Sequence, residues 1–356
     1  MNVLMFATRI IYGGGEKVRN WLANGLIQSG HKVIYALKNY NDSAIEDLKR
    51  VGLYNDIIIV DSYSHLKKKN FFQYKLAIEQ IIKKYNVDVL IIFGGSLQEQ
   101  IIARNLGVKV ILSERCDPHS RKIPSQILKQ IQYRFADGYV FQTPEASLCY
   151  GKKVKNMSVV IPNPIIDRLS EPIFKNLRKE IVSVGRLSKE KNHKMLLEAF
   201  SMIHNKIPDY KLVIYGSGPL ESQINNYISA HKLSGKVFII KGKTNITEQI
   251  KGASLFVLPS NTEGMPNALI EAMSMGLLCI STDCPIFGPR FLVQSGNNAF
   301  LTPINNPSEL AHNILLALNA PNADNIRHEA VKIRETLNSG VIFSKWITYI
   351  EKVFKS

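Results

Sequence analysis

The chain has 356 residues, 45% of them hydrophobic, which is enough to bury the cores of two domains of ordinary size. Its 45 basic and 29 acidic residues give a net charge of +16, which favours an anionic partner: a phosphorylated substrate, an anionic lipid surface or nucleic acid. Its four cysteines lack the paired spacing of a zinc site, and no apolar run approaches the ~18 residues of a membrane-spanning helix, so the sequence argues against both classes.

The first half of the chain alternates short apolar runs, which predict strands, with amphipathic segments, which predict helices. The expected strands are residues 3–7, 32–37, 56–60, 87–92, 108–112 and 138–142, and the expected helices are 16–29, 70–85, 96–105 and 120–135. Residues 1–7 are expected to be a strand and not a signal peptide, because Arg9 and a glycine cluster follow. This alternation is typical of a parallel, doubly wound sheet.

The proline-broken segment 161–165 suits a linker, and the same alternation restarts after it. The expected strands are 180–184, 211–215, 237–241, 255–258 and 278–282, and the expected helices are 193–204, 220–231, 246–252 and those beginning at 267 and 307. We therefore predict an α/β chain with two Rossmann-like domains, residues 1–164 and 165–340, followed by an apolar helix within 341–356.

A glycine cluster, Gly13 to Gly15, follows the first strand. An NAD-binding fingerprint would need a third glycine where Val18 stands, and a carboxylate at the end of the second strand, where the sequence has Leu37 and Lys38. Two interpretations remain: a loop whose backbone approaches a ligand closely, or a tight strand-to-helix turn.

Two loops of the second half carry charged residues at the start of a helix. Arg186 and Lys191 are five residues apart, and a guanidinium and an ammonium in this arrangement can hold a diphosphate from two sides. Glu263 and Glu271 are eight residues apart, beside a helix N-terminus that suits a phosphate, and carboxylates accept hydrogen bonds from sugar and ribose hydroxyls. A nucleotide-sugar would satisfy all of these groups. The alternative is that Glu263 caps the helix and Glu271 is a solvated charge.

This segment, residues 259–273, resembles the E-x7-E motif of retaining glycosyltransferases with the GT-B fold, family 4 in particular. The family's loop reads P-S-x-x-E-G-x-P-N-x-x-x-E-A-M, and every fixed position is present. Residues 185–192 match its G-R-L-x-x-x-K-N motif. The resemblance covers nearly the whole chain and implies two domains that face each other across a cleft. Residues 1–164 would form the acceptor side, 165–340 would bind the donor, and 341–356 would pack back on the first domain.

The resemblance also implies a role for each matching residue. Arg186 and Lys191 would hold the donor diphosphate and Glu263 the sugar hydroxyls, so these three are the catalytic candidates, while Glu271 would bind the ribose. The expected donor-binding residues come from five loops: Gly14, Gly15, Gly185, Gly216, Lys243, Gly264, Met265, Pro266, Asn267 and Glu271.

Residues 113–118 depart from the common family pattern, in which many members have a histidine that contacts the donor sugar. Their S-E-R-x-D-P form, together with residues 283–289, resembles a subset associated with bacterial surface-polysaccharide galactosyl and N-acetylgalactosaminyl transferases. The candidates for the acceptor cleft are Glu16, Glu114, Arg115, Asp117 and His119. A solvated loop histidine is the alternative for His119.

The predicted reaction is transfer of a hexose or N-acetylhexosamine, with retention, from a UDP-sugar to a saccharide acceptor linked to polyprenyl diphosphate. The chain contains no Asp-x-Asp, so Arg186 and Lys191 are expected to take the place of a metal, and no cofactor is expected. The alternatives are a nucleotide-sugar epimerase of the same fold, or a non-catalytic binder of anionic membrane or nucleic acid. With the enzyme assignment, no nucleic-acid partner is expected.

Basic and apolar residues are mixed in two segments of the first half. Lys67, Lys68 and Lys69 precede Phe71 and Phe72, and residues 120–135 interleave basic with apolar side chains. Such a mixture predicts a cytoplasmic protein held peripherally on the anionic inner face of the cell membrane. The alternative is that Ile127, Leu128 and Ile131 face the core and the charges are only solvated.

Overall fold

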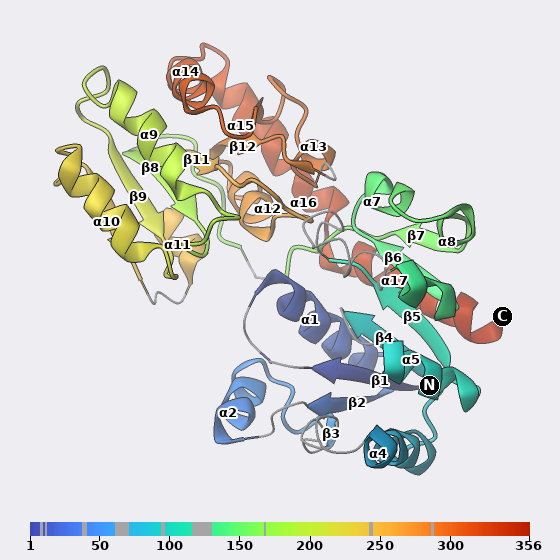
Figure 1. Cartoon of the computed structure of the whole chain (residues 1–356). Coiled ribbons are helices and arrows are strands. Elements are labelled where there is room, and N and C mark those ends of the chain that lie inside the picture. Colours follow the sequence, from blue (N-terminus) through green and yellow to red (C-terminus); the bar gives the residue numbers. More distant parts are fainter. Residues whose placement is uncertain are drawn as a thin grey trace. The chain divides into compact units, whose positions relative to one another are not determined.

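The computed structural model describes residues 1–7, 10, 13–37, 41–60, 71–93, 97–115, 130–166, 169–241, 245–285 and 288–356. The chain folds as two compact units (Figure 1). The first unit comprises residues 1–166 together with 339–356, and the second comprises 167–338.

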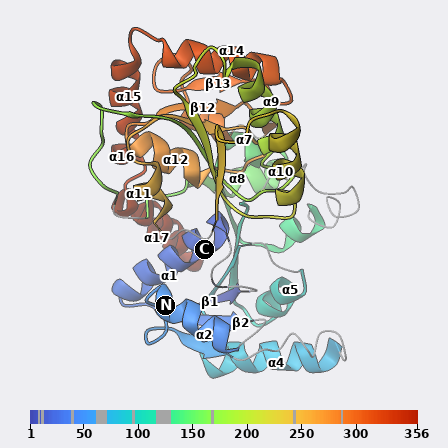
Figure 2. The same cartoon turned by 90° about the vertical axis from the view of Figure 1, so that its left-hand side faces the viewer.

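The first unit is built on a parallel sheet of seven strands in the order β3-β2-β1-β4-β5-β6-β7. The strands are β1 (Asn2–Ala7), β2 (Lys32–Leu37), β3 (Ile58–Val60), β4 (Val89–Phe93), β5 (Lys109–Ser113), β6 (Gly138–Phe141) and β7 (Ser158–Val160). The helices are α1 (Gly14–Gln28), α2 (Asp42–Arg50), α4 (Phe71–Lys84), α5 (Leu97–Asn105), the 3₁₀ turn η2 (Tyr133–Phe135), α7 (Pro144–Leu148), α8 (Lys152–Asn156) and α17 (Ser339–Lys355). Helices cover both faces of the sheet, with α5 on the opposite side from α1 and α17 (Figure 2). This explains why the central strands are continuously apolar.

The last helix, α17, packs on the first unit although it follows the second in sequence. Trp346 is fully buried, and its ring stacks on that of Phe93 with the centroids 5.9 Å apart. The backbone N–H of Tyr139 donates a hydrogen bond to Tyr349 Oη at 2.8 Å. A Cβ at Gly138 would lie 2.8 Å from the side chain of Val353, so a glycine in β6 allows this close packing.

The second unit has a parallel sheet of six strands in the order β10-β9-β8-β11-β12-β13. The strands are β8 (Arg178–Val184), β9 (Lys211–Tyr215), β10 (Val237–Ile240), β11 (Ala253–Leu258), β12 (Leu278–Thr282) and β13 (Phe300–Thr302). The helices are α9 (His193–Ile203), α10 (Glu221–Ala230), α11 (Ile246–Ile250), α12 (Asn267–Ser274), α13 (Gly288–Leu292), α14 (Pro307–Leu318), α15 (Ala323–Val331) and α16 (Ile333–Thr336). β11 is buried along its whole length and lies between β8 and β12, so the loops after these strands meet at one edge of the sheet.

The predicted alternation of strands and helices is confirmed, and three strands (32–37, 211–215 and 278–282) have the predicted bounds. Among the elements that were not predicted are α2, α7, α8, β7, α13 and β13. β7 and β13 have three residues each, and α2 buries only Leu48, so their apolar patterns are too short or too sparse to recognise. Most of the predicted helix 120–135 lies outside the described residues. No helix in the described ranges is long and apolar enough to cross a membrane.

Candidate active site

The loops after β8 and β9 are held together by a close approach of their backbones. A Cβ at Gly216 would lie 1.9 Å from the carbonyl oxygen of Gly185, and one at Gly218 would lie 2.4 Å from that of Leu187. The Leu187 N–H donates a hydrogen bond to the Ser217 carbonyl at 2.9 Å. Glycines at 216 and 218 are therefore required by packing of the site's own loops, whether or not a ligand contacts them.

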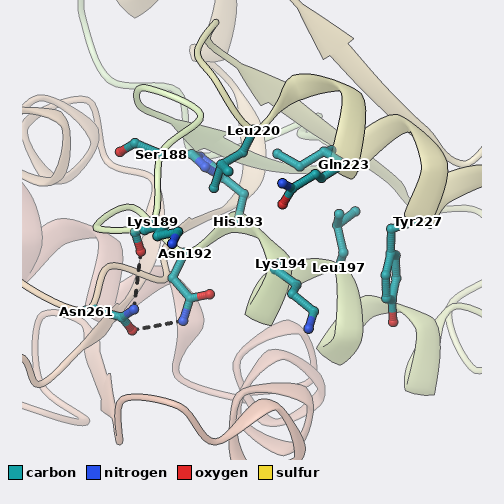
Figure 3. A pocket seen from close by; sticks show the side chains of 11 residues that line it. Ser188, Lys189, Asn192, His193, Lys194, Leu197, Leu220, Gln223, Tyr227 and Asn261 are labelled. Atoms are coloured by element: carbon teal, nitrogen blue, oxygen red, sulfur yellow. Dashed lines mark hydrogen bonds between the residues drawn. The ribbon is translucent and has the colours of Figure 1, made fainter.

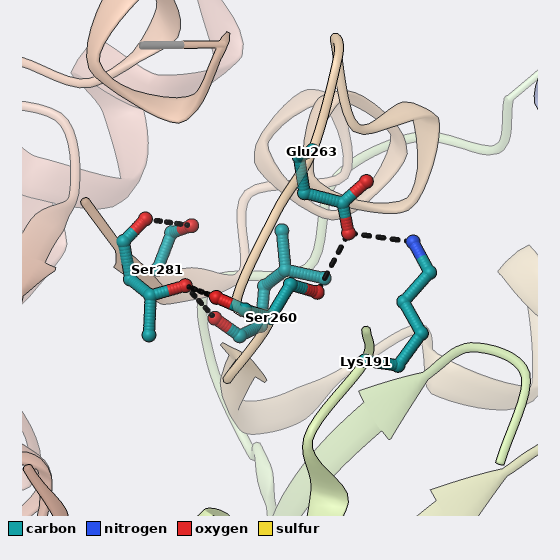
Figure 4. A network of polar contacts seen from close by, with 6 residues as sticks. Lys191, Ser260, Glu263 and Ser281 are labelled. Atoms are coloured by element: carbon teal, nitrogen blue, oxygen red, sulfur yellow. Dashed lines mark hydrogen bonds and ion pairs between the residues drawn. The ribbon is translucent and has the colours of Figure 1, made fainter. Parts of the chain in front are cut away.

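An ion pair joins the loop after β8 to the loop after β11. Lys191 Nζ donates to Glu263 Oε1 at 2.5 Å, and Ser260 Oγ donates to the same oxygen at 2.6 Å (Figure 4). The Glu263 side chain is only 9% exposed, whereas that of Lys191 is 30% exposed. The structure thus brings together two catalytic candidates that are 72 residues apart in sequence. Ser260 is a third member of this cluster that the sequence analysis did not single out.

Amide contacts beside the ion pair fix the two loops further. The Asn261 N–H donates to the Glu190 carbonyl at 2.8 Å, and Asn192 Nδ2 donates to Asn261 Oδ1 at 2.9 Å. Asn192 has a positive φ of 44° and caps α9 by accepting from the Met195 N–H at 3.3 Å. An asparagine suits this position because its side chain tolerates the left-handed conformation and caps the helix.

The helix α12 begins directly after this loop. Its N-cap residue is Pro266, which provides no side-chain capping bond, while Glu263 Oε1 is engaged by Lys191 and Ser260. Met265 and Pro266 are buried, and Gly264, Asn267 and Glu271 are half-buried. A Cβ at Gly288 would lie 1.5 Å from the Gly264 carbonyl oxygen, so the glycine of the 283–289 motif lets that segment pack against the loop.

Arg186 lies in the same loop as Lys191 but is exposed. The pKa of the neighbouring Glu190 carboxyl is lowered, first by a hydrogen bond from Ser188 and by its own backbone N–H, with smaller contributions from the charges of Arg186 and Lys191. Among the described residues, no group of three His, Cys, Asp or Glu side chains is placed to hold a metal ion.

In the first unit, Glu114 is buried and not open to solvent. Its Oε2 accepts hydrogen bonds from Tyr133 Oη at 3.0 Å and Tyr150 Oη at 3.3 Å. The two tyrosine rings stack with their centroids 3.9 Å apart. Burial, with a smaller contribution from the Glu114 charge, raises the pKa of Tyr133 well above its usual value, so this phenol stays protonated and donates.

Arg115 also packs into the first unit. Its Nη1 donates to Asn163 Oδ1 at 2.9 Å, and its guanidinium carbon lies 5.3 Å from the centroid of Phe93 and 5.4 Å from that of Trp346. Burial lowers the pKa of this guanidinium, while the charge of Glu114 raises it. A Cβ at Gly15 would lie 4.0 Å from the Arg115 Cβ, so the glycine loop and the 113–115 segment are neighbours.

The remaining predicted site residues lie at the start of α1 or outside the described residues. Gly14 is exposed and Glu16 half-buried, both in the first turn of α1. Asp117, His119 and Lys243 lie outside the described residues. The tyrosine pair around Glu114 was missed because Tyr133 and Tyr150 stand 19 and 36 residues beyond it, with no local spacing to signal the contact.

The chain has clear relatives among glycosyltransferases. The family model for glycosyl transferases group 1 matches residues 167–334. An uncharacterized glycosyltransferase of Haemophilus influenzae is 27% identical over 314 residues, which cover 87% of this chain and 88% of that protein. The Escherichia coli UDP-Gal:alpha-D-GlcNAc-diphosphoundecaprenol alpha-1,3-galactosyltransferase is 34% identical over 161 residues, which cover 41% of each.

Solved structures agree on the fold. The crystal structure of Anabaena HepE in complex with UDP superposes with a TM-score of 0.83 at 15% identity, over 99% of this chain and all of that one. Staphylococcus aureus TarM, in a complex that contains UDP, gives a TM-score of 0.81 at 14% identity over all of both chains. Residues 167–334 thus match the domain of the group 1 glycosyl transferases, and the fold of the chain is that of GT-B glycosyltransferases.

Proposed function

We propose that the chain transfers a hexose or N-acetylhexosamine, with retention of configuration, from a UDP-sugar to a saccharide acceptor linked to polyprenyl diphosphate. The observation that carries this proposal is the contact between Lys191 and Glu263 at the edge of the second sheet. It brings an ammonium and a carboxylate into one cluster, which supports a site where the ammonium holds a diphosphate and the carboxylate accepts from sugar hydroxyls. The acceptor class is supported by the Escherichia coli relative, whose name gives a diphosphoundecaprenol acceptor.

The charges of the site suggest how the reaction proceeds. As the bond from the sugar to the diphosphate breaks, negative charge grows on the leaving diphosphate, and Arg186 and Lys191 stabilise it. Before this step, when the donor binds, Lys191 exchanges part of its contact with Glu263 for the diphosphate, which frees the Glu263 carboxylate to accept from hydroxyls of the donor sugar. Glu271 accepts from the ribose. The acceptor attacks from the face that the diphosphate leaves, and a phosphate oxygen takes its proton.

The direct test is a screen of UDP-sugars with the purified chain and a polyprenyl-diphosphate-linked saccharide. We expect UDP release that requires the acceptor, and a product whose new linkage keeps the anomeric configuration of the donor, read by NMR. Isomerisation of the UDP-sugar without transfer would favour the epimerase alternative, and an inverted product would contradict the retaining mechanism.

A membrane-bound acceptor requires the protein to reach the lipid surface, and we propose that the first unit docks there. Phe72 is 63% exposed on α4, and Ile131 and Phe135, on either side of the exposed Arg134, are 40% and 38% exposed. Lys67, Lys68 and Lys69 and most of segment 120–135 lie outside the described residues. The exposure of Ile131 argues against the alternative that it faces the core.

Docking can be measured by co-sedimentation with lipid vesicles. Binding should need anionic lipid, weaken with salt, and fall at least tenfold when the three lysines become glutamate, because each basic residue near the surface contributes about 1 kcal/mol. Equal binding to neutral vesicles would reject docking through these charges and leave the transferase proposal intact.

A further inference from the structure

A cavity of about 450 Å³ lies between the first turns of α9 and α10 in the second unit (Figure 3). Its floor is apolar and comes from Leu197 on α9 and from Leu220, Ile224 and Tyr227 of the α10 region. None of Arg186, Lys191, Glu263 and Glu271 is among its lining residues. The cavity is therefore distinct from the proposed donor site, and its size is typical of pockets for small organic ligands.

The charge around the cavity is positive. Lys189 and Lys194 are among its lining residues, and no lining residue is a carboxylate. Lys194 Nζ is 3.4 Å from Glu198, but its side chain is 71% exposed, so this ion pair is weak and can rearrange. The helices α9 and α10 both begin at this cavity, and helix N-termini carry partial positive charge. These charges favour an anionic group as the ligand of the cavity.

A buried imidazole nitrogen provides an independent sign of a ligand. His193 is the first residue of α9, lines the cavity beside Leu220 (Figure 3), and is 2% exposed. Its Nδ1 is buried and has no hydrogen-bond partner in the described parts of the chain. Leaving such a group without a partner costs free energy, and most buried polar atoms in folded proteins are paired. An oxygen of a bound anion at the start of α9 would accept a hydrogen bond from it.

We propose that this cavity binds a nucleoside phosphate, with the phosphate at the start of α9 between Lys189 and Lys194 and the base over the apolar floor. A flat aromatic base suits a floor of Leu197, Ile224 and Tyr227, whereas a sugar ring would leave its hydroxyls against apolar side chains. The amide of Gln223, at the wall of the cavity, can hydrogen-bond the polar edge of the base. This assignment does not depend on the proposed transferase reaction.

The cavity shares a loop with the donor site. Ser188, Lys189 and Asn192 line the cavity, while Lys191 of the same loop pairs with Glu263. Binding must therefore be measured by a probe inside the cavity, because occupancy of the donor site could shift the loop. The δ1 methyl of Ile224 is such a probe. Its NMR signal can be assigned with Ile224→Val.

In the experiment, UMP is titrated into methyl-labelled full-length protein as the probe of the cavity. We expect a saturable shift of the Ile224 methyl that persists in the double variant Arg186→Ala, Lys191→Ala. Lys194→Glu should weaken UMP binding at least tenfold, while the control Lys206→Glu, the same charge change at an exposed lysine just after α9, should leave it within twofold. No Ile224 shift, or a shift lost in the double variant, would overturn the proposal.

Three further ligands identify which part of UMP is recognised. Inorganic phosphate, uridine and glucose 1-phosphate should each bind at least tenfold more weakly than UMP, because the cavity pairs a phosphate site with a base site. Equal binding of inorganic phosphate would reduce the site to a general anion site, and equal binding of glucose 1-phosphate would show that a sugar occupies the apolar floor. Either result would overturn the nucleoside assignment.

Discussion

The two units use the same kind of sheet but present their charged residues in opposite ways. In the second unit, Glu263 meets the ammonium of Lys191, which is 30% exposed and can turn toward a ligand. In the first unit, Glu114 is buried between two tyrosine hydroxyls, in an aromatic cluster. Both glutamates come shortly after a strand, but Glu263 is paired with a partly solvated cation, whereas Glu114 accepts from two buried phenols. A carboxylate after a strand can thus belong to a reaction site or to the framework, and its partners decide which.

The largest expected effect is the loss of turnover when Lys191 or Arg186, the cations of the second unit, is removed. Lys191→Ala or Arg186→Ala should each lower turnover by about 2–4 kcal/mol of transition-state stabilisation, or roughly 30- to 1000-fold. The measurement is kcat with the UDP-sugar and acceptor that the screen identifies. Lys206→Ala, at an exposed lysine just after α9, is the control, with less than a threefold effect on kcat. Near-normal turnover in both variants would remove these cations from the mechanism.

His193 should make the second unit sensitive to mild acid. Burial, aided by the charge of Lys191, lowers the pKa of His193 to about 4, against about 6.5 when the chain is unfolded. Between these values the unfolded state binds more protons, so stability should be complete above pH 6.5 and fall by about 3 kcal/mol as pH drops to 4.

The measurement is chemical unfolding at several pH values. His193→Gln cannot titrate and should flatten this part of the profile. His312→Gln, at an exposed histidine on α14, should leave the profile unchanged. A profile for His193→Gln that matches the unmutated chain would show that other groups cause the acid sensitivity.

A smaller effect, on stability, should show whether Glu114 supports the fold of the first unit or acts on substrate. Glu114→Gln removes the charge that the phenols of Tyr133 and Tyr150 bind, and should cost about 1–2 kcal/mol of stability, since hydrogen bonds to a charged group exceed neutral ones by about that much. A double-mutant cycle with Tyr133→Phe should show coupling of the same order. If Glu114→Gln keeps full stability but loses turnover, then Glu114 acts on substrate and the framework interpretation fails.

The sequence predicted the second unit better than the first for a physical reason. Residues that follow parallel strands are brought to one edge of the sheet, so the meeting of the loops around Lys191 and Glu263 follows from the order of strands and helices alone. The surroundings of Glu114 depend on side-chain packing between Tyr133 and Tyr150, and no periodic pattern in the sequence predicts this packing. The same holds for Gly138, whose lack of a side chain is explained only by Val353 on α17. His193 looked like an ordinary helix residue, because its burial and unpaired nitrogen come from tertiary packing.

The smallest expected effect is that of a chelator. Two protein cations lie in one loop beside the E-x7-E segment, and a cation from Arg or Lys neutralises a departing diphosphate as a divalent metal would. The sequence contains no Asp-x-Asp to hold such a metal. We therefore expect turnover to stay within twofold after dialysis against EDTA, and added Mg²⁺ or Mn²⁺ to restore nothing. Lys191→Ala adds a sharper test. If a metal ion also neutralised the diphosphate, added Mg²⁺ or Mn²⁺ would raise the residual turnover of this variant. Loss of activity in EDTA, reversed by either ion, would show that the loop cations of the second unit do not suffice and that a metal carries part of the charge.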